Sequence, residues 1–117
     1  NKSNEWLSGI SSINKELGPL NLETNKDIFK DIKKKNIVKT DTLNNICNKY
    51  NVMNIDFLKI DTEGHDLIVL KSINLERINV KFIKIEHKHL DKNEIKNYLE
   101  KYNYLVYIEN DDIYAIK

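Results

Sequence analysis

The sequence contains very little cysteine, proline, glycine, alanine or arginine. Cysteine and proline occur once each, and 117 residues include three glycines. The single cysteine, Cys47, excludes an internal disulfide and fits a reducing, cytoplasmic setting. Leu43 and Ile46 share a helical face with Cys47, which we therefore interpret as a core residue and not a nucleophile. No apolar run approaches the roughly 20 residues of a membrane span, so we expect no membrane partner.

An excess of charge of one sign is also lacking. Lys and Arg total 19 and Asp and Glu total 18, which gives a net charge of +1. A nearly neutral chain has no overall electrostatic attraction for nucleic acid or an anionic membrane. Trp6 and the six tyrosines form no evenly spaced stripe for base stacking, so we expect no nucleic-acid partner either. Lys, Asn and Ile fill 52 of the 117 positions. Such a skew is typical of an AT-rich genome, so we do not interpret it as a functional signal.

The length accommodates one modest domain, since domains most often have about 100–150 residues. Residues 1–35 are poorly periodic and are expected to form an irregular upstream segment. From residue 36 onward, strand and helix patterns alternate, which predicts an α/β fold with a mostly parallel sheet and a closing antiparallel hairpin. The expected strands cover residues 37–40, 55–61, 80–86, 104–109 and 112–117, and the expected helices follow Thr40 or Asp41, Gly64 and Asp91.

Polar residues follow two of the expected strands. Residues 61–66 read DTEGHD and place three carboxylates and an imidazole on one turn, and residues 86–89 read EHKH. Ligands of open parallel sheets bind outside the carboxyl ends of the strands. The two strand ends together predict a polar pocket in which a general base meets a hydroxyl group.

Several of these residues also have a purely structural interpretation. Asp61 could cap the helix that begins near Gly64, and Gly64 could be required only for a positive φ angle. His65 and His87 could be hydrogen-bonded walls of the pocket. A non-catalytic interaction module that uses an exposed sheet edge is one alternative function. A metal-dependent hydrolase is another, with four ligands: Asp61, His65, His87 and His89.

The string KIDTEGHDLIVLK at residues 59–71 resembles the carboxyl-terminal half of the FkbM-type methyltransferases. Thr42-Leu43 before a helix and IKIEH at residues 83–87 add to the resemblance, which covers about residues 36–117. It implies a partial class I Rossmann-like methyltransferase fold with S-adenosylmethionine as the cofactor. It also implies methyl transfer to a hydroxyl oxygen of a small-molecule or glycan acceptor, such as a sugar or a natural product.

The family's cofactor-binding elements have no counterpart in this sequence. In the family pattern, residues 55–61 and 80–86 are the fourth and fifth strands of the sheet. A glycine-rich turn follows the first strand of that sheet. Neither Gly9 nor Gly18 lies in a strand-to-helix turn of that kind. We therefore expect residues 36–117 to be the carboxyl-terminal half of a methyltransferase domain whose amino-terminal, cofactor-binding half is missing, and we expect the isolated chain to be inactive.

The resemblance selects the reaction, and the strand-end positions select the residues. Asp61 is expected to face the methyl-transfer centre and to contact the cofactor. Glu63, Glu86 or His87 is expected to orient or deprotonate the acceptor hydroxyl. The expected catalytic residues are therefore Asp61, Glu63, Glu86 and His87, and the expected substrate-binding residues are His65 and His89.

Overall fold

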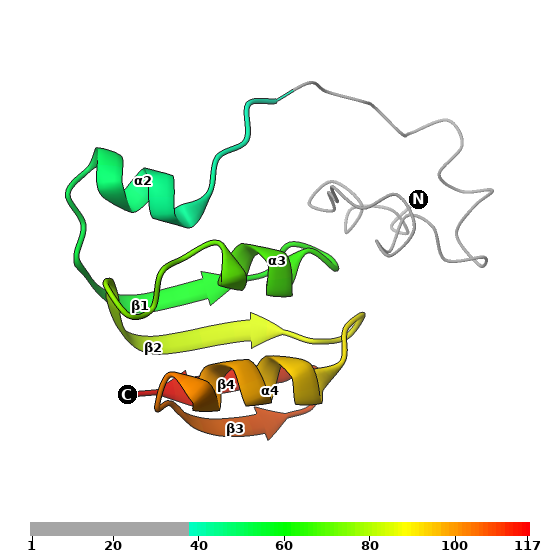
Figure 1. Ribbon diagram of the computed structural model, residues 1–117. Coiled ribbons are helices and arrows are strands. Elements are labelled where there is room, and N and C mark those ends of the chain that lie inside the picture. The colour runs from blue at the N-terminus through cyan, green and yellow to red at the C-terminus, as the bar shows by residue number, and fades with distance from the viewer. Residues whose placement is uncertain (1–37) are drawn as a thin grey trace, which may run out of the picture.

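The computed structural model describes residues 38–117 (Figure 1). The expected segment at residues 1–35 lies outside the described residues. The strand predicted over residues 37–40 is wrong where it can be compared, because residues 38–40 have no regular structure. The described elements are α2 (Leu43–Lys49), β1 (Asn54–Ile60), α3 (Asp66–Lys71), β2 (Asn79–Glu86), α4 (Lys92–Lys101), β3 (Leu105–Glu109) and β4 (Asp112–Ile116).

Helix α2 begins one or two residues later than the sequence predicts. Its N-cap is Thr42, whose hydroxyl accepts a hydrogen bond from the Asn45 backbone N–H at 3.1 Å. Asp41 instead accepts from the Thr42 backbone N–H at 2.8 Å and from the Asn45 side chain at 2.7 Å. Cys47 is 5% exposed and packs in the hydrophobic core, so its interpretation as a core residue is confirmed.

The α/β prediction and the predicted closing antiparallel hairpin are confirmed, and the sheet formed by the described strands is mixed, with β4 running opposite to the other three strands. Its strand order is β1-β2-β4-β3, and only the β1–β2 pair is parallel. After the turn that contains Asn110, β4 returns antiparallel to β3 and inserts between β3 and β2. This insertion makes both of its pairings antiparallel, which explains why a single parallel pair exists among residues 38–117.

The hydrophobic core lies between the sheet and helices α3 and α4, which lie in front of the sheet in Figure 1. Side chains alternate between the faces of a strand, so Ile83 and Ile85 of β2 share the face that the helices cover, and both are fully buried. Leu70 of α3 and Leu99 of α4 are also fully buried. Burial of one such side chain contributes about 1.5–3 kcal/mol. The core thus fixes the two strand ends that carry the predicted site.

The opposite face of the sheet carries a row of four aromatic rings. Phe57 lies 5.5 Å from Phe82, Phe82 lies 6.3 Å from Tyr114, and Tyr114 lies 6.5 Å from Tyr107, as measured between ring centroids. Each ring comes from a different strand. The sequence shows no such row because its members become neighbours only through pairing between strands.

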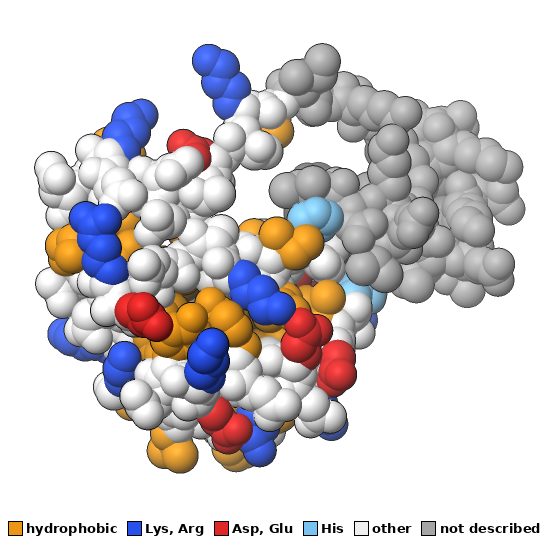
Figure 2. Space-filling model, in the orientation of Figure 1, with side chains coloured by type: hydrophobic (Ala, Val, Ile, Leu, Met, Phe, Trp, Pro, Cys, Tyr) orange, Lys and Arg blue, Asp and Glu red, His pale blue; other side chains and the backbone are white. Residues whose placement is uncertain are grey.

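The helix side of the sheet has a surface of mixed charge. Figure 2 shows lysine and acidic side chains on both sides of an apolar strip, without a large area of one sign on this face. None of the helices in residues 38–117 has the length and the apolar character needed to cross a bilayer.

Candidate functional site

The turn between β1 and α3 is held by the Asp66 carboxylate. Its two oxygens accept hydrogen bonds from the backbone N–H groups of Thr62 at 2.8 Å and Gly64 at 3.0 Å. Asp66 is 1% exposed, and a buried carboxylate is stable only with such partners. The sequence analysis considered Asp61, not Asp66, as the carboxylate that accepts backbone N–H groups in this region. In the structure the accepting carboxylate is that of Asp66, which sequence reasoning did not select as a site residue.

Glu63 lies between the two hydrogen-bonded backbone groups and has a left-handed conformation. Its φ angle is 53°, and Gly64 follows with a φ angle of 97°, the positive value that the structural interpretation of Gly64 requires. For a residue with a Cβ atom, this conformation costs about 1–2 kcal/mol. Glu63 Oε2 lies 4.0 Å from His89 Nε2, and both side chains are largely buried. The turn therefore brings Glu63 to a residue that follows β2.

Glu86 is the last residue of β2 and lies in the electrostatic field of this turn. Burial raises the pKa of the Glu86 carboxyl, and the negative charges of Glu63, Asp61 and Asp66 raise it further, while Lys88 opposes the shift. Such mutual influence requires the carboxylates to lie near one another. The structure thus brings Asp61, Glu63 and Glu86 to one end of the sheet, as the strand-end argument predicts.

Asp61 itself is a half-exposed residue that does not cap α3. Its Oδ2 atom lies 2.9 Å from Lys59 Nζ, and its side chain is 43% exposed. An exposed ion pair of this kind contributes about 0–1 kcal/mol to stability. Asp61 is therefore accessible at the strand end and contributes little to holding the fold.

The two histidines that the sequence places beside the carboxylates have different surroundings. His87 Nε2 lies 3.0 Å from the Asn110 carbonyl oxygen, and the His87 backbone N–H donates to the Asp111 carbonyl at 2.8 Å. These bonds hold His87 to the β3–β4 turn. His65 is the N-cap residue of α3, and its Nδ1 atom is buried without a hydrogen-bond partner in the described part of the chain, as is Thr62 Oγ1.

The four metal ligands considered for a hydrolase are not assembled into a site. Within residues 38–117, no group of three or more His, Cys, Asp or Glu side chains is arranged to hold a metal ion. Asp61 pairs with Lys59, and the His87 ring faces the Asn110 carbonyl. The described residues therefore do not support the metal-dependent alternative.

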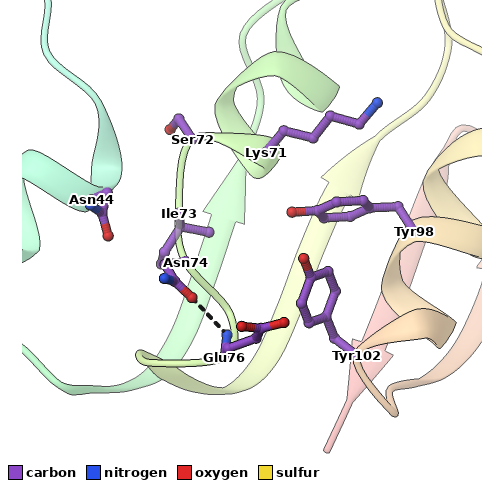
Figure 3. A pocket seen from close by; sticks show the side chains of 8 residues that line it. All are labelled: Asn44, Lys71, Ser72, Ile73, Asn74, Glu76, Tyr98 and Tyr102. Carbon is purple, nitrogen blue, oxygen red and sulfur yellow. Dashed lines mark hydrogen bonds between the residues drawn. The ribbon is translucent and has the colours of Figure 1, made fainter.

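A hollow of about 350 Å³ lies elsewhere, on the helix side of the sheet beside the carboxyl end of α3. The Tyr98 and Tyr102 side chains both point into it in Figure 3, with ring centroids 5.1 Å apart. Burial raises the pKa of Tyr98 to about 12, and the neighbouring Tyr102 adds to the shift. None of the predicted site residues lines this hollow. Its lining residues are Asn44, Lys71, Ser72, Ile73, Asn74, Glu76, Tyr98 and Tyr102.

The comparison with protein families extends beyond the motif at the β1–α3 turn. Residues 1–106 match the family described as the methyltransferase FkbM domain. This match includes both strand ends. It begins at residue 1, whereas the resemblance noted in the sequence begins at about residue 36. No curated protein and no solved structure matched the chain. Because the family match spans most of the 117 residues, the chain belongs to the FkbM methyltransferase domain family.

Proposed function

We propose that the chain is part of an S-adenosylmethionine-dependent O-methyltransferase that acts on a hydroxyl group of a sugar or natural product. The observation that carries this proposal is a group of carboxylates at the ends of two parallel strands in a chain of the FkbM family. In an open sheet this is the end at which ligands bind. The carboxylates disfavour an anionic acceptor by repulsion and can accept hydrogen bonds from neutral hydroxyl groups.

The proposal includes a Rossmann-like sheet in which β1 and β2 are the fourth and fifth strands. The parallel β1–α3–β2 unit supports this assignment, because parallel strands joined by a helix are the building unit of such sheets. The outer edge of β1 has no strand partner within residues 38–117. That edge is where further parallel strands of the proposed sheet would pair.

Glu86 is the proposed general base. A base whose pKa is raised toward the working pH accepts a proton more readily, and positioned bases typically contribute about 10²–10⁴-fold to rate. Burial and the neighbouring carboxylates shift the pKa of Glu86 in this direction. Glu86 would take the hydroxyl proton as the acceptor oxygen takes the methyl group. Asp61 and Glu63 would orient the hydroxyl, and His65 and His89 would contact the rest of the acceptor.

The described residues do not form a glycine-rich cradle for the cofactor. Gly64 is the single glycine in residues 38–117, and its N–H already donates to Asp66. The proposal therefore assigns the acceptor side of the reaction to these residues. S-adenosylmethionine, which family membership implies, would supply the methyl group.

Replacement of Asp61 by Asn in the full-length protein tests the assignment. The experiment follows label transfer from S-adenosylmethionine to a panel of glycans and hydroxylated natural products. We expect Asp61→Asn to lower turnover by about 10²-fold, the cost of a misplaced acceptor hydroxyl. Folding should remain intact, because the contact of Asp61 within residues 38–117 is an exposed ion pair.

Asp56 provides a matched control in β1, the strand that Asp61 follows. It also forms an exposed ion pair, with Lys81 at 2.6 Å, but it lies near the amino end of β1, far along the strand from the carboxylate group. Asp56→Asn should therefore keep the wild-type turnover. Equal turnover of Asp61→Asn and the wild type on every accepted substrate would rule out a role for Asp61 in the reaction.

A further inference from the structure

We propose that Asp66 is a positioning residue that holds Glu63 in its left-handed conformation and so directs the Glu63 carboxylate toward the acceptor. The inference deepens the proposed function and rests on it for the identity of the acceptor. Its geometric content, that Asp66 sets the direction of Glu63, is independent of any substrate.

The hydrogen bonds of Asp66 differ from those of a helix cap. The N-cap residue of α3 is His65, whose side chain makes no capping bond. Asp66 is inside the helix, and its carboxylate reaches back to the N–H groups of Thr62 and Gly64, which precede the helix. These bonds fix the turn and leave the N–H groups of α3 itself unaffected.

The two bonds enclose the one residue of the turn whose conformation is costly. Glu63 lies between Thr62 and Gly64 and has a φ angle of 53°. A residue with a Cβ atom persists in this region only where its surroundings determine it. Asp66, which is 1% exposed, is the buried group that provides this determination.

The conformation determines where the Glu63 side chain points. It places Glu63 Oε2 4.0 Å from His89 Nε2, across the gap between the end of β1 and the segment after β2. A return of Glu63 to negative φ would redirect its side chain relative to the backbone and separate this pair. Asp66 would therefore affect the site without contacting the acceptor.

The test is an NMR comparison of the wild-type chain with Asp66→Asn. The asparagine keeps the shape of the side chain but replaces one acceptor oxygen by an NH₂ group. We expect amide exchange at Thr62 and Gly64 to become about tenfold faster or more, as loss of a charge-assisted hydrogen bond implies. The nuclear Overhauser contact between Glu63 and the His89 ring should disappear. Contacts between Ile60 and Ile85, which are paired in the sheet, should remain.

Asp91 provides a matched control, because it also bonds a backbone N–H, that of Asn93 at 2.8 Å, beside a helix start. Asp91→Asn should leave the Glu63–His89 contact and the exchange at Thr62 and Gly64 unchanged. Asp66 is not the positioning residue if Asp66→Asn retains both the slow amide exchange and the Glu63–His89 contact. The same conclusion follows if Asp91→Asn loses both to the same extent.

A second variant covers the case in which Asp66→Asn does not fold. Glycine adopts the left-handed conformation without steric cost, so Glu63→Gly should restore folding to an Asp66→Asn chain. Recovery of the Ile60–Ile85 contacts in the double variant supports the proposal, and failure to recover them overturns it. No arm of this experiment uses methyl transfer, so a negative result here is distinct from failure of the proposed enzyme activity.

Discussion

Replacing Tyr104 by Phe removes one buried hydrogen bond and leaves the aromatic ring in the core. The Tyr104 hydroxyl donates to the Val80 carbonyl oxygen at 2.6 Å, and Tyr104 is 4% exposed. Tyr104 immediately precedes β3, whereas Val80 belongs to β2. The bond therefore ties the start of the hairpin to the parallel half of the sheet.

The expected loss follows from the burial of both partners. A neutral hydrogen bond contributes about 0.5–1.5 kcal/mol net, and an abandoned buried acceptor costs about 1–3 kcal/mol. Val80 is fully buried, so water cannot readily replace the hydroxyl. We expect Tyr104→Phe to lower the free energy of unfolding by about 1–3 kcal/mol. With a urea m-value of about 2 kcal/mol/M, the midpoint falls by roughly 0.5–1.5 M.

Urea denaturation followed by far-UV circular dichroism measures this shift, and Tyr107→Phe is the matched control. Tyr107 is 62% exposed on the sheet face opposite the helices, so its loss of a hydroxyl should change the free energy of unfolding by less than about 0.5 kcal/mol. Equal midpoints for Tyr104→Phe and Tyr107→Phe, with unchanged m-values, would refute the reasoning that the Val80 carbonyl depends on this hydroxyl.

Two further predictions concern the pH dependence of stability. The pKa of Tyr98 is raised to about 12 by burial and by Tyr102, so the protonated phenol stabilises the fold below about pH 10, and this contribution is lost as pH rises toward 12. Urea midpoints between about pH 9 and 12 should therefore fall less steeply for Tyr98→Phe than for wild type, and parallel curves would contradict this. The pKa of Glu86 is also raised, so the protonated Glu86 carboxyl stabilises the fold at pH values below its ordinary pKa of 4.5. This contribution is lost as pH rises through the folded-state pKa. As pH rises through this pKa, Glu86→Gln should become more stable relative to wild type. A similar gain in the exposed control Glu109→Gln would refute an effect specific to the Glu86 carboxyl.

Apart from the strand expected at residues 37–40, the positions of the strands could be predicted from the sequence because their signals are local. The predicted strands at 55–61 and 80–86 correspond to Asn54–Ile60 and Asn79–Glu86. Runs of β-branched residues with turn residues at their ends define such strands without reference to distant parts of the chain. The α/β prediction depended only on the order of these elements, so it was also correct.

The arrangement of the hairpin strands could not be predicted, because it depends on partners that are distant in sequence. Either hairpin strand could have paired with β2. In the structure β4 does, and its Ile113 and Ala115 stand opposite Ile85 and Ile83 and are almost fully buried. The corresponding face of β3 is only partly buried, as at Val106. Burial of the β4 side chains thus determines which hairpin strand pairs with β2, because the alternating pattern is present in both strands.

The exclusion of Asp61 as a helix cap could have come from the alternation of side chains along β1. Ile60 is 3% exposed and belongs to the core, so the next side chain, Asp61, points away from the helix-covered face. Asp61 therefore could not reach the N–H groups at the start of α3. Asp66 bonds the N–H groups of Thr62 and Gly64 before the helix, but the folding back of its side chain over four residues depends on the left-handed turn at Glu63, which a sequence pattern does not specify.

The negative charges that raise the pKa of Glu86 come from the turn between β1 and α3 and not from the hairpin. Asp112 stands directly opposite Glu86 in the β2–β4 register, where two like charges would destabilise the sheet. Lys84 Nζ lies 2.8 Å from Asp112 Oδ2, and this contact raises the pKa of Lys84 and compensates the Asp112 charge. The carboxylates that raise the pKa of Glu86 are those of residues 61–66. Burial is the larger cause of the raised pKa of Glu86, and the segment that carries the family motif adds to it through the charges of Glu63, Asp61 and Asp66.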